Sequence, residues 1–266
     1  MRIRGERECR ECGDRWSYYE TSSIECPECK SLWSVGVDER TAHTDAPSVL
    51  DLSAHRARFG EARGTLPEEG VDDLKTDLRS YARKRGFIRG GELLPLDETY
   101  LAARELLEAV DCYDRLRDPT DRDREYLLDL LSGADDGDRP AAEHVPDSLR
   151  EARGMAAVRA VGEYRGDVLA FLDDLEDVGE TDGGETDSGH AVSVSGDDIR
   201  TRAAPAREIL ERLRDQIKRI EALNGDVPPA DTDVLVDASN ALGEYVRTGD
   251  ESALDRAYRR LPNETA

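Results

Sequence analysis

The sequence predicts a mainly α protein in which a small N-terminal β ribbon precedes an all-α helical bundle with a disordered acidic loop. Three observations support this fold class. Two Cys-x-x-Cys pairs and the β-forming stretches around them fall within residues 1–40. From residue 71 onward, apolar residues recur at the spacing of a helix. Residues 178–196, which lie between two helical patterns, are acidic and of low complexity.

The composition indicates the environment in which the chain folds. The 266 residues include 60 acidic and 37 basic side chains, which give a formal net charge of -23, and lysine is scarce. This pattern resembles proteins of salt-loving archaea; an ordinary acidic protein is the alternative. A surplus of carboxylates keeps a chain dispersed, and its self-repulsion is tolerable where salt shortens the Debye length to about 3 Å at 1 M.

The cysteine count and the hydropathy indicate the compartment. Four of the five cysteines are paired in sequence, and the fifth, Cys112, lies in a helical pattern. This distribution favours metal ligands and a spare thiol over a disulfide framework, and it fits a reducing cytoplasm. The N-terminus lacks the apolar core of a signal peptide, and no apolar run approaches the ~18 residues of a membrane span. We therefore expect a soluble, cytoplasmic protein without a membrane partner.

The four paired cysteines form the candidate site. Thiolates are soft ligands, and each Cys-x-x-Cys turn lets two sulfurs reach one ion, so that two turns complete a tetrahedron. Because protein would fill all four positions, none remains for water, and we expect one structural zinc without a catalytic role. Iron in the same cage and a redox function are the alternatives. The candidate metal ligands are Cys9, Cys12, Cys26 and Cys29.

The residues beside the cysteines suit tight turns in a small β domain. Gly13 tolerates a positive φ after the first pair, and Pro27 fixes φ within the second. Trp16–Tyr19 and Leu32–Val37 are rich in β-forming residues, with a turn predicted at Thr21–Ser23. We expect the aromatic side chains to form the ribbon's own core, and a domain this small usually needs a metal to fold.

These motifs carry a resemblance. Residues 1–37, with Cys-Arg-Glu-Cys-Gly and Cys-Pro-Glu-Cys-Lys, resemble the zinc ribbons of transcription factor IIB, of ribosomal proteins and of RNA-polymerase subunits, and the rubredoxin-like ribbons. More narrowly, Arg-Gly-Glu-Arg-Glu-Cys, Arg-Trp-Ser-Tyr-Tyr-Glu and Ser-Val-Gly-Val-Asp-Glu-Arg-Thr resemble an uncharacterised haloarchaeal family with an N-terminal zinc ribbon. The resemblance implies zinc ligation by the four cysteines. Lys30 departs from it, because many ribbons have glycine there.

Beyond the ribbon, residues 41–70 are predicted to be a linker, and residues 71–177 are predicted to be helical. Ser53 is a possible N-cap of a short helix in the linker. Val71, Leu74 and Leu78 begin the first helical stripe. Gly86 is predicted to end this first helix, and Asp97 is predicted to be the N-cap of the next. Thr120 and Asp123 form a capping-box pattern at the start of a helix that Gly133 ends. Pro146 is predicted to start a long helix that continues to about residue 177.

The C-terminal part returns to helical periodicity after the acidic loop. From Asp173 to Asp198 there are ten acids and no lysine or arginine, so residues 178–196 cannot bury enough apolar surface to become ordered. Residues 197–262 are predicted to pack back on the bundle. Their clearest apolar stripe consists of Ala206, Leu210, Leu213, Ile217 and Ile220 and resembles the seam of a short coiled coil. We expect this helix to form an antiparallel hairpin with the helix before the loop. Pro205 would kink this helix or start it.

The remaining candidate residues are weak. The four histidines, His43, His55, His144 and His190, are scattered in predicted loops, and we expect them at the surface. Cys112 is expected to pack between helices. The sequence contains no phosphate loop, dinucleotide fingerprint or nucleophile elbow.

The sequence therefore predicts a non-enzymatic interaction or adaptor protein with a protein partner, in transcription or RNA-related machinery. Binding of nucleic acid by the ribbon is the alternative, with Arg2, Arg4 and Arg7 beside Trp16 or Trp33. Against it, residues 1–35 carry six cations and seven acids, whereas phosphate binding needs clustered cations. An enzyme built in the helical region is the third possibility, and it would require a cleft lined by several buried acids or histidines.

Overall fold

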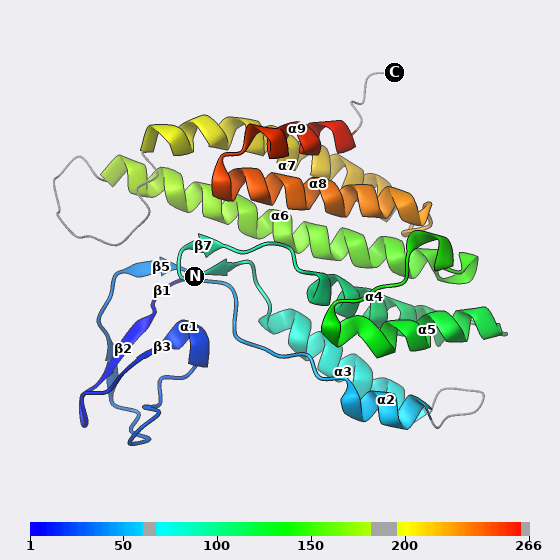
Figure 1. The fold of residues 1–266 in the computed structure, drawn as a ribbon, viewed down its shortest axis with the longest axis horizontal. Helices are drawn as coiled ribbons and strands as arrows, with labels where there is room; N and C mark the ends of the chain where they lie inside the picture. Colours follow the sequence, from blue (N-terminus) through cyan, green and yellow to red (C-terminus); the bar gives the residue numbers. More distant parts are fainter. Residues whose placement is uncertain (61–67, 182–195, 262–266) are drawn as a thin grey trace.

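The computed structural model describes residues 1–60, 68–181 and 196–261 (Figure 1). The mainly α prediction is confirmed: small sheets occur near the N-terminus, and long helices make up the rest of the described chain. The β ribbon lies beside one end of the helical body. Within the body, α6 separates the C-terminal helices α7 to α9 from α4 and α5, with α3 packed against α4 (Figure 1).

The ribbon contains two small antiparallel sheets. Strand β2 pairs with both β3 and β4, and strand β1 pairs with β5. The ribbon therefore extends past residue 40, because its last strand closes on its first. The strands are β1 (Arg2–Arg4), β2 (Glu6–Cys9), β3 (Arg15–Ser17), β4 (Ser34–Gly36) and β5 (Arg40–Ala42).

One stretch of the ribbon differs from the β prediction. After β3, Tyr18–Thr21 forms a helical turn, α1. The amide of Tyr18 donates to the Gly5 carbonyl at 2.7 Å, and the turn closes at Ser22, whose φ is 50°. This turn places the Tyr19 ring between the ribbon and the helical body. A continued strand would direct the side chain elsewhere.

Residues 41–60 pack against the body, although the sequence indicates a linker. Leu50, Leu52 and Phe59 are buried in the main core. Helix α2 (Ser53–Gly60) starts at Ser53, and its first amide donates to the Asp51 carboxylate at 2.9 Å. Ser53 is thus the first helical residue and not the cap. Residues 61–67 of the predicted linker lie outside the described residues.

The helical elements follow the predicted order. The long helices are α3 (Glu68–Lys84), α4 (Glu98–Tyr113), α5 (Asp121–Gly133), α6 (Arg150–Thr181), α7 (Gly196–Ala222), α8 (Pro229–Thr248) and α9 (Glu251–Arg260). A two-stranded hairpin, β6 (Ile88–Arg89) with β7 (Glu92–Leu93), connects α3 to α4. Short 3-10 turns lie at Ala134–Asp136, Ala142–His144 and Asp147–Leu149.

Two predicted caps are confirmed. The Asp97 carboxylate accepts the Tyr100 amide at 2.6 Å and starts α4. Thr120 and Asp123 form a reciprocal capping box at the start of α5, with aspartate in place of the usual glutamate. Caps of this kind stabilise a helix by about 0.5–2 kcal/mol.

Helix α4 is the centre of the body. It is buried along most of its length between α3, α5 and α6. An edge-to-face cluster joins it to its neighbours: the Phe87 ring lies 5.2 Å from Tyr100 and 5.0 Å from Tyr164, measured between centroids. The helix ends at Tyr113.

The predicted hairpin of two long helices is present. Helices α6 and α7 run antiparallel and pack together (Figure 1). Every residue of the predicted seam on α7 is buried. Helix α7 begins at Gly196, upstream of Pro205, and α6 continues to Thr181, past its predicted end at 177. Most of the predicted acidic loop, residues 182–195, lies outside the described residues.

A close backbone approach on α6 gives the first testable prediction. A Cβ on Gly154 would lie 2.1 Å from the Gly225 carbonyl oxygen, so Gly154→Ala should lower the free energy of unfolding by about 1–3 kcal/mol. Gly162 lies on the same helix with nothing within 4 Å of its Cβ position, so Gly162→Ala should raise that free energy by about 0.5–1 kcal/mol. Urea unfolding measures both. Equal effects of the two substitutions would contradict the packing described.

Candidate metal centre

The first Cys-x-x-Cys pair lies on a tight turn that begins at the end of β2. The Gly13 amide donates to the Cys9 carbonyl at 3.1 Å, and the Cys9 amide donates to the Asp14 carbonyl at 2.8 Å. These two bonds close the loop around the intervening residues. They hold the Cys9 and Cys12 side chains on the same turn.

The second pair repeats this arrangement in a separate loop. The Lys30 amide donates to the Cys26 carbonyl at 3.0 Å, and the Cys26 amide donates to the Ser31 carbonyl at 2.9 Å. Each of the two turns, which we call knuckles, therefore consists of two cysteines and the same pair of backbone bonds. This repeat is what two-plus-two ligation of one ion requires.

The residue after each pair has a left-handed backbone. Gly13 has φ 77° and Lys30 has φ 61°. Glycine adopts this region freely, whereas a residue with a Cβ is strained there by about 1–2 kcal/mol. The departure at Lys30 therefore leaves the turn geometry intact, at some cost in strain.

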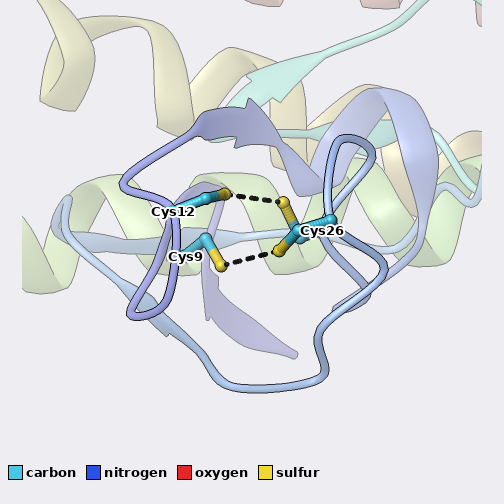
Figure 2. Close-up of side chains that lie close together, drawn as sticks. Cys9, Cys12 and Cys26 are labelled. Carbon is cyan, nitrogen blue, oxygen red and sulfur yellow. Dashed lines mark hydrogen bonds between the residues drawn. The ribbon is translucent and has the colours of Figure 1, made fainter.

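The four sulfur atoms come together in one cluster (Figure 2). The Sγ atoms of Cys9 and Cys29 are 3.5 Å apart, as are those of Cys12 and Cys26, and all four lie within 4.8 Å of one another. A tetrahedral cage with metal–sulfur bonds of about 2.3 Å has sulfurs roughly 3.8 Å apart. The candidate ligands thus fit a single metal ion.

The electrostatics of the cluster favour a cation. A hydrogen bond from the Cys12 amide helps lower the pKa of the Cys9 thiol to about 7. The pKa of Cys12 is raised to about 12: the Asp14 amide opposes the rise, but contacts with Cys29 and Cys26 favour the neutral thiol. Adjacent thiolates repel one another, so one sulfur ionises readily and its neighbour does not. A divalent cation would remove that conflict and hold all four as thiolates.

The ribbon's own core is very small. Cys9, Cys26 and Trp16 form it, and the Trp16 indole donates to the Ser23 carbonyl at 3.0 Å. Trp33 does not belong to it, because 65% of its surface is exposed. Two of the three core residues are candidate ligands, so the interior of the ribbon is largely the metal site itself.

Contacts of the Tyr19 side chain join α1 to β5 and to His43, which follows β5. The Tyr19 hydroxyl bonds the Thr41 hydroxyl at 2.5 Å, and its ring lies 4.8 Å from the His43 ring. Gly5 is required at this contact, because a Cβ there would lie 1.9 Å from the Tyr19 ring. A Cβ on Gly90 would lie 3.0 Å from the same ring, so Tyr19 also lies close to the turn between β6 and β7.

Buried carboxylates continue the attachment into the helical body. Asp45 is fully buried and accepts Arg85 at 2.6 Å, together with Arg89. Asp167 on α6 accepts the Thr44 hydroxyl at 2.7 Å and the Phe87 amide at 2.6 Å. The segment after the ribbon is therefore bonded both to the β6–β7 hairpin and to α6.

The expectation for the histidines is partly wrong. His43 and His55 are both buried. His43 lies against the tyrosine rings of α1, and burial lowers its pKa. His55 bonds Asp77 at 2.8 Å. His144 is exposed as predicted, and His190 lies outside the described residues. Neither buried histidine belongs to the sulfur cluster.

Two buried glutamates of the helical body already have arginine partners. Glu105 accepts Arg153 at 2.8 Å and Arg139 at 3.3 Å, and Glu108 pairs with Arg159. A hollow of about 500 Å³ beside Glu108 also contains Cys112. The buried Cys112 thiol accepts Arg115 at 3.5 Å, as a packing residue would. Ion pairs that join helices account for these carboxylates.

The chain belongs to a family of unknown function, DUF7117, whose model matches residues 1–261. No curated protein and no solved structure matches the sequence. Within the described ranges, none of the helices combines the length and the apolar character needed to cross a membrane.

The strained knuckle gives the second prediction. Lys30→Gly should relieve the backbone and tighten metal binding by about 1 kcal/mol, roughly fivefold. Gly13→Ala is the converse: nothing lies within 4 Å of its Cβ position, so only the positive φ should weaken binding, by a similar amount. Competition with a chromophoric chelator measures both affinities. A loss of affinity in Lys30→Gly would show that the side chain itself supports the site.

Proposed function

We propose that this chain is a non-enzymatic interaction protein in which one structural zinc holds a ribbon that binds a protein partner. The observation that carries this proposal is the clustering of four cysteine sulfurs on two matching knuckles. The helical body then serves as the scaffold for the ribbon. The proposal assigns no catalytic role to the metal, because four thiolates would fill its coordination.

Zinc is favoured by the donor set. Four sulfur ligands in a tetrahedron suit zinc, and iron in the same cage is the alternative. The need for a metal follows from the size of the ribbon core, which consists of two cysteines and Trp16. A domain with so little buried apolar surface depends on the ion for its folding free energy.

Removal of one ligand gives the third prediction. Cys26→Ser should reduce the zinc content from one per chain to near zero and unfold the ribbon, because a buried ligand is lost. Cys112→Ser is the matched control, since it also replaces a buried cysteine but lies outside the cluster. Elemental analysis gives the metal content, and hydrogen exchange should show lost protection in β2 to β4 while α4 stays protected. A zinc-free wild-type protein with protected ribbon strands would refute the proposal.

The location of exposed apolar side chains supports a protein partner on the ribbon. Among the described residues, five of the seven exposed large hydrophobic side chains lie within residues 1–37. The ribbon members are Met1, Ile24, Leu32, Trp33 and Val37. The described part of the helical body therefore exposes few large hydrophobic side chains, whereas the ribbon exposes several. Exposed tryptophan is a frequent anchor of protein interfaces.

The setting we propose is the cytoplasm of a salt-loving archaeon, in transcription or RNA-related machinery. Thiolate ligands need a reducing compartment. The net charge of -23 and the low lysine content suit high salt. The transcription-related assignment rests on the resemblance of the ribbon to those of transcription factor IIB and RNA-polymerase subunits.

The partner surface gives the fourth prediction. Affinity purification in molar KCl should retain a protein partner, and Trp33→Ala should weaken its binding by about 2 kcal/mol or roughly thirtyfold, as for an interface anchor. Leu223→Ala, an exposed apolar residue of the body, should leave retention unchanged. Mass spectrometry identifies the partner. Equal retention by wild type and Trp33→Ala would place the interface elsewhere.

A further inference from the structure

A hollow on the ribbon concentrates positive charge in this acidic chain. It has a volume of about 430 Å³ and contains four arginines and no carboxylate among its lining residues. The arginines come from strands β1, β2 and β5, so the folded ribbon brings together cations that are far apart in sequence. The residues that line the hollow include Arg2, Arg4, Arg7, Arg40, Tyr18 and Ile24.

Strand pairing places two of these cations directly opposite each other. In the β1–β5 register, Arg4 is the cross-strand partner of Arg40. Like charges in this position destabilise a sheet. Gly36 makes the arrangement possible, since a Cβ there would lie 2.5 Å from the Arg4 side chain. The ribbon thus maintains a repulsive pair that an anion would relieve.

The charges in the hollow are only partly compensated. Arg2 pairs with Asp174 on α6. Arg4 donates to the Asp38 carbonyl, and Arg7 donates to the Ser34 hydroxyl at 3.1 Å and to its carbonyl at 3.2 Å. These neutral oxygens orient the guanidinium groups and leave their charge in place. Asp38 is the nearby acid, and its carboxylate accepts the Gly5 amide at 2.9 Å.

Other arginines of the ribbon do have a carboxylate partner. Arg10 and Arg15 both pair with Glu8. In the described part of the chain, Arg4, Arg7 and Arg40 have no such carboxylate partner. The charge of the ribbon is near zero overall, yet three arginines of this hollow lack the carboxylate partner that Arg10 and Arg15 have.

The other lining residues indicate the class of ligand. Guanidinium groups bind phosphate oxygens through paired hydrogen bonds. Tyr18 and Ile24 add an aromatic ring and an apolar side chain beside the arginines. Proteins that bind single-stranded nucleic acid combine these elements, with cations along the backbone and aromatic rings under the bases.

We infer that this hollow binds phosphate groups of single-stranded RNA or DNA, with a base against Tyr18. The inference is argued from the arginines and Tyr18 and does not rest on the protein partner proposed above, although Ile24 belongs to both surfaces. It differs from the expectation for the whole ribbon, because the overall charge conceals the three arginines without a carboxylate partner.

The test uses the full chain with its metal and fluorescein-labelled oligouridylate or oligothymidylate of about 12 nucleotides, within the site size of single-strand binders. Fluorescence anisotropy over a series of KCl concentrations gives affinity and salt slope. Each arginine that neutralises a phosphate contributes about 0.7 to that slope. Arg4→Gln and Arg40→Gln should therefore each lower the slope by about 0.7, and Tyr18→Ala should lower the affinity with the slope unchanged.

Controls separate binding from folding. Arg15→Gln removes an exposed arginine of the same ribbon and should leave binding unchanged. Arg40→Gln should keep its zinc and melt at the same or a higher temperature, because it relieves the opposition to Arg4. Lack of oligonucleotide binding by folded wild type, or an equal loss in Arg15→Gln and Arg40→Gln, would overturn the inference. Equal affinity for a polyglutamate peptide would overturn it as well and would indicate an acidic protein ligand.

Discussion

The approach of four cysteine sulfurs to within 4.8 Å of one another is the constraint on which the ribbon depends. Thiols at this distance cannot all ionise together: the pKa of Cys9 is lowered, first by the Cys12 amide and also by its thiol neighbours, whereas contacts with Cys29 and Cys26 raise the pKa of Cys12 against the effect of the Asp14 amide. The ribbon has little else to hold it, because its core beyond two of the cysteines is Trp16. In our proposal a zinc ion turns this electrostatic conflict into the main stabilising interaction. Strands β2 and β4, paired through Cys9 and Ser34, then have fixed positions.

The ribbon is seated on a body whose polar interior is also paired. Tyr19 and His43 stack at the junction, and Asp167 bonds the following segment to α6. Farther in, Glu105 is shared by Arg139 and Arg153. Removing one partner of such a buried pair leaves an uncompensated charge, which typically costs about 3–5 kcal/mol. In our proposal the body is the scaffold, while the ribbon carries the exposed tryptophan and Arg4, Arg7 and Arg40, which line the hollow.

Features set by neighbouring residues could be predicted from the sequence. The apolar stripe from Val71, the capping box at Thr120 and the two knuckles depend on spacings of three or four residues, and the structure contains all three. Features set by distant partners could not. His43 and His55 lie in short segments without helical periodicity, and their partners Tyr19 and Asp77 are not identified by anything in the local sequence.

The arginine hollow was only partly visible in the sequence for the same reason. The alternation of Arg2 and Arg4 is local, but the contribution of Arg40 depends on the pairing of β1 with β5. Likewise, the packing of residues 41–60 depends on a core that the helices supply, so a stretch of mixed composition resembled a linker. The net charge of the ribbon does not distinguish arginines that pair with a carboxylate from arginines that do not, because the folded structure decides which of them have partners.

X-ray absorption at the zinc edge of the full-length protein distinguishes filled from open ligation. Ligation by four cysteines requires one zinc per chain with four sulfur neighbours at about 2.3 Å and no nitrogen or oxygen bound to the metal. A mixed shell that includes a light atom would contradict filled ligation by Cys9, Cys12, Cys26 and Cys29. It would also reopen a catalytic role for the metal.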